Sequence, residues 1–347
     1  MSDQSLSFES YHVGQEGTTI TRTVAEADII SFACLTEDYN MPHVDRHAME
    51  TSMYGSRVAH GLLGSSIATG MLSLCAPHII GRGVPESYFS GFEANYRGGL
   101  KLGDTIHVRW RVAETAPSHT HQGFGLVTTR FQVVTHEGVA VYDGTFSTLV
   151  RMGSAKGAEL KLLPGTPWPV MPSASGQARV PEADNSPADD VKETAGRTIT
   201  ETDIVNYAGL TGDYDPRYVD AEFARGSMFG ERIAPGMLAF TVAFGRWTSA
   251  RFALGGLEPP PPDTAAAGTR ADTGTTVDSG TMVAGHLNDT ASFLAPVKIG
   301  DTIRCRYKAL ATRASKSRPG LTLTTTGLQI VNQRDEVVQE GSTIMLG

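Results

Sequence analysis

One stretch of this chain occurs twice. The segment RTVAEADIISFACLTEDYNMPHVD, residues 22–45, returns as RTITETDIVNYAGLTGDYDPRYVD, residues 197–220, at an offset of 175 positions (197 − 22). His43 of the first copy becomes Tyr218 of the second, and His60 is replaced by proline at the same offset. An imidazole gives or takes a proton near neutral pH, whereas a phenol with a pKa of about 10 does not do so readily, and a proline has no titrating group. The repeat therefore predicts two similar domains, with the proton-transfer groups concentrated in the first.

The composition is that of a globular protein of about two domains. The chain has 347 residues, of which 40% are hydrophobic and 19% charged, with a formal net charge of −8. This acidic balance argues against a nucleic-acid partner. The three cysteines have no Cys-x-x-Cys spacing, which fits a reducing compartment. We see no leader peptide, and the apolar stretch 62–76 is too short to cross a bilayer, so we expect a soluble cytoplasmic protein with no membrane partner.

Each copy is followed by the same order of elements. A Thr-x-x-Glu capping box is predicted to open a short helix in both copies, with the pairs Thr23–Glu26 and Thr198–Glu201. An apolar segment rich in Gly, Ala and Ser then predicts a buried helix, at 61–76 and again at 236–250. Long strands joined by polar turns follow, and both copies share a Gly-Asp-Thr-Ile turn, at Gly103 and at Gly300.

These elements predict an α+β fold made twice, with one long helix embraced by a mostly antiparallel sheet in each half. Joining the edges of the two sheets would remove exposed edges. We expect a catalytic N-terminal domain at 1–152, a linker at 153–194 and a second domain at 195–347. The shared turn recurs at an offset of 197 (300 − 103), so the second copy has gained 22 residues (197 − 175), which we expect as a mobile loop at 254–280.

The sharpest chemical candidates lie in the first copy. Asp38 and His43 are five residues apart across a turn marked by Asn40 and Pro42, so both side chains can point at one place. A carboxylate and an imidazole around one water suit the hydration of an activated double bond, or its reverse. Amides at the start of the helix at Gly61 would stabilise the negative oxygen of the intermediate. Standing alone, such a pair is also typical of a helix cap beside a surface imidazole, but the loss of both histidines in the second copy favours function.

Two segments carry a family resemblance, TEDYNMPHVD at 36–45 and VAHGL at 58–62. They resemble the signature of the MaoC-like (R)-specific enoyl-CoA hydratases, the hydratase-2 group of hotdog-fold proteins. The resemblance covers both halves, residues 12–150 and 195–347, and implies a tandem (double) hotdog. It also implies a hydro-lyase of fatty acid metabolism that hydrates a trans-2-enoyl-CoA to an (R)-3-hydroxyacyl-CoA, or catalyses the reverse dehydration, with no metal and no other cofactor.

The resemblance assigns roles to individual residues. It implies that Asp38 and His43 are the catalytic pair and that the Gly61 amide belongs to the oxyanion hole. It further implies residues that support the loop or bind the substrate, namely Asn40, His60 and Ser66.

The sequence departs from the family signature at one point. Met41 stands between Asn40 and Pro42, where the signature has proline directly after asparagine. The spacing from Asp38 to His43 is retained, so the departure affects the detailed shape of the loop and the room for the acyl group.

Two alternatives stay open, a hotdog acyl-CoA thioesterase and a non-catalytic acyl-thioester-binding protein. The second half keeps Asp213 but has Tyr218 in place of the histidine, so we expect it to be degenerate and to support substrate binding. His119 and His121 lack a third ligand, and we predict no metal there. The sequence is compatible with a homodimer. It does not determine the acyl group, the physiological direction, or the choice between CoA and acyl-carrier protein.

Overall fold

The computed structural model describes residues 6–52, 54–155, 160, 191–253 and 285–347. Most of the linker expected at 153–194, and all of the loop expected at 254–280, lie outside these residues. Within the described part of the chain, no helix combines the length and the apolar character needed to cross a membrane.

The first half is a curved sheet around one buried helix. Its helices and strands are η1 (Phe8–Ser10), β1 (Glu16–Thr18), β2 (Arg22–Thr23), α1 (Glu26–Thr36), α2 (Met41–Val44), α3 (Arg46–Glu50), α4 (Gly61–Cys75), η2 (Pro77–Ile80), β3 (Ser87–Tyr96), β4 (Thr105–Pro117), β5 (Phe124–Thr135) and β6 (Ala140–Arg151). The central helix α4 is buried along nearly its whole length, because its small residues let the sheet and neighbouring helices approach closely.

The second half repeats this order. Its elements are β7 (Lys192–Glu193), β8 (Arg197–Thr198), α5 (Glu201–Thr211), α6 (Pro216–Val219), α7 (Ala221–Arg225), α8 (Gly236–Ala253), β9 (Gly285–Phe293), β10 (Thr302–Ala314), β11 (Thr322–Val331) and β12 (Val337–Leu346). The two buried helices predicted at 61–76 and 236–250 are thus α4 and α8.

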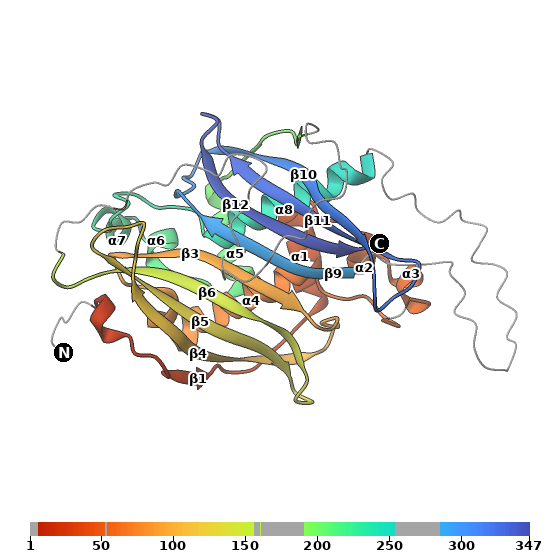
Figure 1. Ribbon diagram of the computed structural model, residues 1–347, viewed down its shortest axis with the longest axis horizontal. Coiled ribbons are helices and arrows are strands. Elements are labelled where there is room, and N and C mark those ends of the chain that lie inside the picture. The colour runs from red at the N-terminus through yellow and green to blue at the C-terminus, as the bar shows by residue number, and fades with distance from the viewer. Residues whose placement is uncertain (1–5, 53, 156–159, 161–190, 254–284) are drawn as a thin grey trace, which may run out of the picture.

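The two halves share one antiparallel sheet, as the sequence predicted. Its order is β1-β4-β5-β6-β3-β9-β12-β11-β10-β7, with β2 on β4 and β8 on β10. Figure 1 shows β3 and β9 side by side at the middle of the sheet. Their register pairs Gly91 with Ser292 and Asn95 with Asn288, around a central pair Glu93–Thr290. Adding 197 to the number of Gly91 gives that of Asn288 (91 + 197 = 288), and adding it to the number of Asn95 gives that of Ser292 (95 + 197 = 292). The two outer pairs therefore exchange under the repeat, and a pseudo-two-fold axis relates the halves at this junction.

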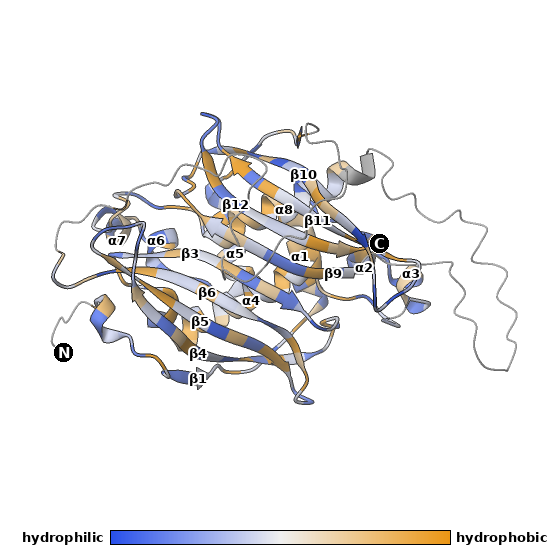
Figure 2. Cartoon of the chain, viewed as in Figure 1, coloured by the Kyte–Doolittle hydropathy of each residue, from blue (hydrophilic) through white to orange (hydrophobic). Residues whose placement is uncertain are grey.

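The helices cover one face of the sheet and interlock across the junction (Figure 1). Helix α8 of the second half packs on α1 of the first, and α4 of the first packs on α5 of the second. At these crossings a glycine allows contact with backbone: a Cβ on Gly245 would lie 2.0 Å from the carbonyl oxygen of Thr36, and one on Gly70 would lie 1.9 Å from that of Thr211. Along β4 and β5, hydrophobic and hydrophilic residues follow one another, as expected for a sheet with one covered face (Figure 2).

The capping boxes expected from the sequence are wrong, because each helix is capped two residues farther along the chain, at Ala25 and at Thr200. Thr23 lies in β2, where its hydroxyl pairs with that of Thr105 at 2.7 Å. Helix α1 is capped by Asp28, whose carboxylate accepts a hydrogen bond of 2.8 Å from the N–H of Ala25. In the second half Thr198 pairs with β10 in the same way. Each threonine lies in the short strand that precedes its helix, and the neighbouring long strand, β4 or β10, engages its hydroxyl, so the cap moves to the next residues along the chain.

Candidate active site

The residues of the first-half motif converge at the amino end of α4. One carboxylate oxygen of Asp38 and one ring nitrogen from each of His43 and His60 lie within 4.8 Å of one another. Asp38 follows α1, and the chain turns there because Glu37 adopts the left-handed conformation with φ 65°. Asp38 and His60 are buried and His43 is half-buried. The structure therefore brings together the carboxylate and the imidazole that the spacing predicted to meet. We call Asp38, His43, His60 and Gly61 the N-terminal site.

Asn40 fixes the orientation of the Asp38 carboxylate. Its backbone N–H donates to Oδ1 of Asp38 at 3.3 Å, and its side-chain amide makes a second, short hydrogen bond to the same oxygen. Among the described residues, none donates a hydrogen bond to the other carboxylate oxygen. That oxygen is therefore available to a water molecule or a substrate hydroxyl.

His43 presents a nitrogen lone pair to the site. Its Nδ1 lies 2.8 Å from the carbonyl oxygen of Val58. A carbonyl oxygen only accepts, so Nδ1 carries the hydrogen, and in the neutral ring Nε2 carries the lone pair. Burial lowers the pKa of His43, while the Asp38 carboxylate and the Val58 hydrogen bond oppose that shift. At neutral pH the ring is neutral, and Nε2 can accept a proton.

His60 supports the ring of His43. The two imidazoles are stacked, with centroids 3.7 Å apart and planes inclined by 29°. Nε2 of His60 donates to the carbonyl oxygen of Asp38 at 2.9 Å, and its Nδ1 is buried without a hydrogen-bond partner among the described residues. Burial, together with the neighbouring His43, lowers the pKa of His60 well below its ordinary value. His60 is thus a neutral residue that joins the start of α4 to the Asp38 loop.

The chemical character of these three side chains also raises the question of a metal ion. Asp38, His43 and His60 are all ligand types, and they lie close enough to share an ion. The two rings are stacked, however, with their planes inclined by 29°, which is not the usual arrangement of two imidazoles that point at one ion from different directions. The arrangement is better suited to proton transfer than to metal binding. His119 and His121 do not belong to this cluster.

Gly61 is the first residue of α4, and its position requires glycine. A Cβ there would lie 2.8 Å from the Tyr96 ring and 3.0 Å from Nδ1 of His286. The amides of the first helical turn have no partner within the helix, so this end can bind an oxyanion. Ser66 is fully buried farther along α4, and its polar neighbour is the hydroxyl of Tyr207 on α5. Among the described residues no hydrogen bond joins Ser66 to the N-terminal site, and its supporting role stays a prediction.

One residue at the site was not found from the sequence. His286 belongs to β9 of the second half, yet its Nδ1 reaches the amino end of α4 beside Gly61. The sequence motif lies wholly in the first copy, so it gives no indication of a residue on β9. A signal was present, however, because at the offset of 197 His286 aligns with Phe89 (286 − 197), a polar residue against an apolar one.

Comparison with known proteins identifies the family of this chain. The MaoC-like domain model matches residues 8–135 and 182–254, which is more than half of the chain. The chain belongs to the MaoC-like family.

Two of three relatives of this MaoC-like chain carry functional names. A 3-hydroxybutyryl-CoA dehydratase of Methylorubrum extorquens is 28% identical over 112 residues, covering 32% of this chain and 67% of that protein. An (R)-specific enoyl-CoA hydratase of Rhodospirillum rubrum is 26% identical over 133 residues, covering 38% of this chain and 88% of that protein. Protein MaoC of Klebsiella aerogenes is 36% identical over 104 residues, which are only 29% of either chain. Two of these relatives are therefore named as a dehydratase and a hydratase, which supports a hydro-lyase at the level of the family.

Solved structures confirm the fold. The protein Rv0216 of Mycobacterium tuberculosis, described as having a double hotdog fold, superposes with a TM-score of 0.66 over 99% of this chain and 98% of its own, at 15% identity. A MaoC-like dehydratase from Phytophthora capsici superposes with a TM-score of 0.54 over 95% of each chain, at 17% identity. The α+β double hotdog that the resemblance implied is correct.

The corresponding place in the second half of this MaoC-like chain is filled. The guanidinium of Arg217 is buried there, where it pairs with Asp215 and donates to the hydroxyl of Ser87 at 3.0 Å. Asp213, the counterpart of the first-half aspartate, has one oxygen without a partner among the described residues. Its burial, together with the charge of Asp215, raises the pKa of Asp213 to about 7. The cavity that remains has a volume of about 10 Å³, which is room for at most one water molecule.

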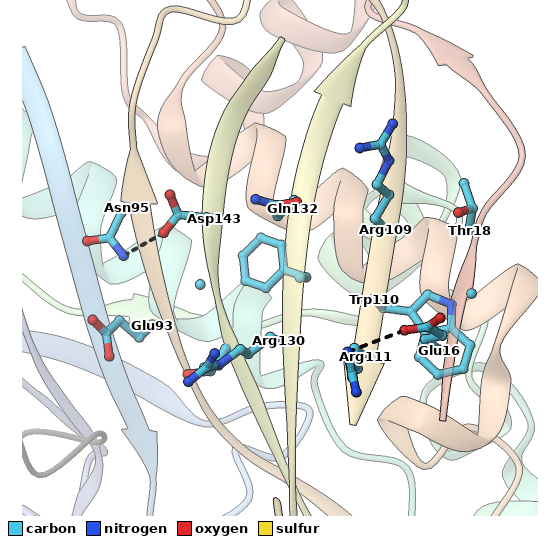
Figure 3. Close-up of a pocket in the computed structure, with 14 residues that line it drawn as sticks. Glu16, Thr18, Glu93, Asn95, Arg109, Trp110, Arg111, Arg130, Gln132 and Asp143 are labelled. Carbon is cyan, nitrogen blue, oxygen red and sulfur yellow. Dashed lines mark hydrogen bonds and ion pairs between the residues drawn. The ribbon is translucent and has the colours of Figure 1, made fainter. Parts of the chain in front are cut away.

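A larger groove lies on the other face of the sheet, away from the helices (Figure 3). Its volume is about 720 Å³, and its walls come from β1, β3, β4, β5 and β6. Polar side chains line it and pair with one another, Arg111 with Glu16 at 3.8 Å and Asn95 with Asp143 at 3.1 Å. Because the sheet separates it from α4 and Asp38, this groove is not part of the N-terminal site.

Proposed function

We propose that this chain is a hydro-lyase that reversibly adds water to a trans-2-enoyl-CoA, giving an (R)-3-hydroxyacyl-CoA. The observation that carries the proposal is the buried Asp38 carboxylate held beside the neutral His43 at the amino end of α4. Relatives in the same family named (R)-specific enoyl-CoA hydratase and 3-hydroxybutyryl-CoA dehydratase support the choice of reaction.

In the proposed reaction, one water molecule lies between Asp38 and Nε2 of His43. The water oxygen bonds to C3 as its proton passes to Nε2, and the π electrons of the C2=C3 bond move towards C2 and the thioester oxygen. The Gly61 amide and the dipole of α4 stabilise that oxygen. The Asp38 carboxylate stabilises the imidazolium, which then returns the proton to C2 as the thioester carbonyl re-forms. One water is added in total, and the reverse sequence is dehydration.

The second half has a supporting role in this proposal, because it holds the loop that carries the catalytic aspartate. Arg246 of α8 pairs with the Glu37 carboxylate at 2.7 Å, and the Ser249 hydroxyl donates to the Glu37 carbonyl at 2.6 Å. Arg197 contacts the other oxygen of the same carboxylate at 3.3 Å. These three side chains of the second half therefore restrain Glu37, the residue next to Asp38. The counterpart of the N-terminal site in the second half is itself filled.

The pH dependence of hydration tests the protonation state of His43. Nε2 must be unprotonated to accept the proton from water, so kcat/KM should rise with pH along an acidic limb. Because burial lowers the pKa of His43 from 6.5, we expect the acidic limb of the profile to be centred below pH 6.5. Initial rates measured between pH 4.5 and 8 would check this, and a limb centred above pH 6.5 would contradict the neutral-base assignment.

The reaction itself is tested with a panel of enoyl-CoA and 3-hydroxyacyl-CoA thioesters of varied chain length and branching. Mass spectrometry should detect the gain or loss of one water, and the enoyl absorbance should fall without release of free thiol. Release of CoA from saturated acyl-CoA would instead favour a thioesterase. Tight acyl-CoA binding with no reaction in either direction would favour a binding protein.

A further inference from the structure

His286 reaches the N-terminal site from the other half of the molecule. Its Nδ1 lies 3.0 Å from the place that a Cβ on Gly61 would occupy. The ring packs against two aromatic rings, with centroid distances of 4.5 Å to Tyr96 and 5.1 Å to Phe244. This nitrogen is therefore fixed beside the first residue of α4, where the thioester oxygen is proposed to bind.

The opposite edge of the His286 ring is fixed by a buried hydrogen-bond network. Nε2 lies 2.8 Å from a carboxylate oxygen of Asp289 and 3.2 Å from the hydroxyl of Thr343. The Tyr96 hydroxyl donates to the other oxygen of Asp289 at 2.6 Å. Asp289 is 0% exposed, so its carboxylate is satisfied entirely from within the protein. A carboxylate accepts, so Nε2 carries a hydrogen, and in the imidazolium form Nδ1 carries one as well.

The pseudo-two-fold axis allows a direct comparison with the filled site of the second half. The offset of 197 aligns each member of the network with a residue on a strand of the opposite half. It pairs His286 with Phe89, Asp289 with Phe92, Thr343 with Phe146, and Tyr96 with Phe293. All four counterparts are phenylalanines. The ring of Phe89 packs 5.7 Å from that of Phe146 and 5.6 Å from that of Phe293. Polar groups therefore occupy these positions only beside Asp38 and His43.

We propose that His286 is a catalytic residue of the N-terminal site, in which its Nδ1–H, as part of an imidazolium paired with Asp289, donates a hydrogen bond to the thioester carbonyl oxygen beside the Gly61 amide. This inference rests on the proposed function and deepens it. The thioester oxygen gains negative charge as water bonds to C3, so a donor fixed there binds the transition state more strongly than the substrate. Asp289, Tyr96 and Thr343 are positioning residues. His286 transfers no proton in this step.

The first test replaces His286 with the residue found at its counterpart. In His286→Phe we expect kcat for enoyl-CoA hydration to fall by a factor on the order of 10² to 10³, with a smaller change in KM. His286→Asn places an amide donor near the former Nδ1, and we expect it to recover at least tenfold of that loss. The matched control is His136→Phe on the exposed turn after β5, which should stay within twofold of wild type. A kcat for His286→Phe within twofold of wild type would overturn the inference.

A second measurement reads the hydrogen bond directly and separates it from a structural role. With Asp38→Asn to stop turnover, an isotope-labelled thioester carbonyl of bound enoyl-CoA should show an infrared stretch below that of the free ligand. Adding His286→Phe should return the stretch towards the free value, and an unchanged stretch would overturn the inference even if the melting temperature fell.

If His286→Phe does not fold, His286→Asn and Asp289→Asn are compared in the same way. Wild-type protein that turns over no enoyl-CoA would refute the proposed function and the inference with it, whereas an active wild type matched by His286→Phe refutes the inference alone.

Discussion

Replacing Asp38 with asparagine, or His43 with alanine, is expected to lower kcat for enoyl-CoA hydration by a factor on the order of 10² to 10⁴. Asparagine keeps the shape of Asp38 but cannot stabilise an imidazolium, and alanine removes the lone pair that Nε2 presents. Steady-state loss of enoyl absorbance measures the effect. A melting curve should show that both variants remain folded.

The second half supplies matched controls for this experiment. Asp213 and Tyr218 occupy the corresponding positions beside the buried Arg217. Asp213→Asn and Tyr218→Phe are therefore expected to leave kcat within twofold of wild type. Equal losses in both halves would refute the assignment of a single active site, and near-normal turnover in both first-half variants would refute the proposed mechanism.

Gly245→Ala is expected to reduce stability and turnover together. The new Cβ would lie 2.0 Å from the carbonyl oxygen of Thr36, so the last turn of α1 or the whole of α8 must move. Overpacking of this kind costs roughly 1–3 kcal/mol in the free energy of unfolding. Thr36 is two residues before Asp38, and a displacement of about 1 Å at a catalytic group can lower the rate on the order of 10²-fold. Urea unfolding and steady-state kinetics on one preparation would measure both effects.

A second helical glycine provides the control for Gly245. Gly209 lies on an exposed face of α5, and a Cβ there would meet only the Tyr214 hydroxyl, at 3.7 Å. Gly209→Ala should therefore raise the free energy of unfolding by roughly 0.5–1 kcal/mol, because alanine loses less backbone entropy on folding, and it should leave kcat unchanged. If Gly245→Ala proved as stable as Gly209→Ala, the close packing of α8 on α1 would be wrong.

Much of the architecture could be predicted from the sequence because the repeat preserves the spacing of whole elements. The offsets of 175 and 197 located both buried helices and the shared sheet, and the second offset also describes the register between β3 and β9. The meeting of Asp38 and His43 was predictable for a similar reason, since five residues across one turn leave little freedom. Their catalytic roles remain predictions.

The features that the sequence could not supply depend on contacts between distant segments. His286 reaches Gly61 only because β9 pairs with β3 and α4 lies beneath that junction. Likewise, the buried Arg217 gives no local sign that it fills a cavity, since its acceptor Ser87 belongs to the other half. The shifted helix caps have the same cause, because β4 engages the Thr23 hydroxyl.

The junction between β3 and β9 has an evolutionary consequence. In a dimer of identical subunits, a two-fold axis forces every residue near it to appear at both pockets, so one pocket cannot change without the other. Covalent fusion removes that coupling. Position 286 can carry a histidine facing one pocket while its counterpart, Phe89, helps to close the other. Duplication would thus have let a single pocket specialise while its twin was converted into scaffold.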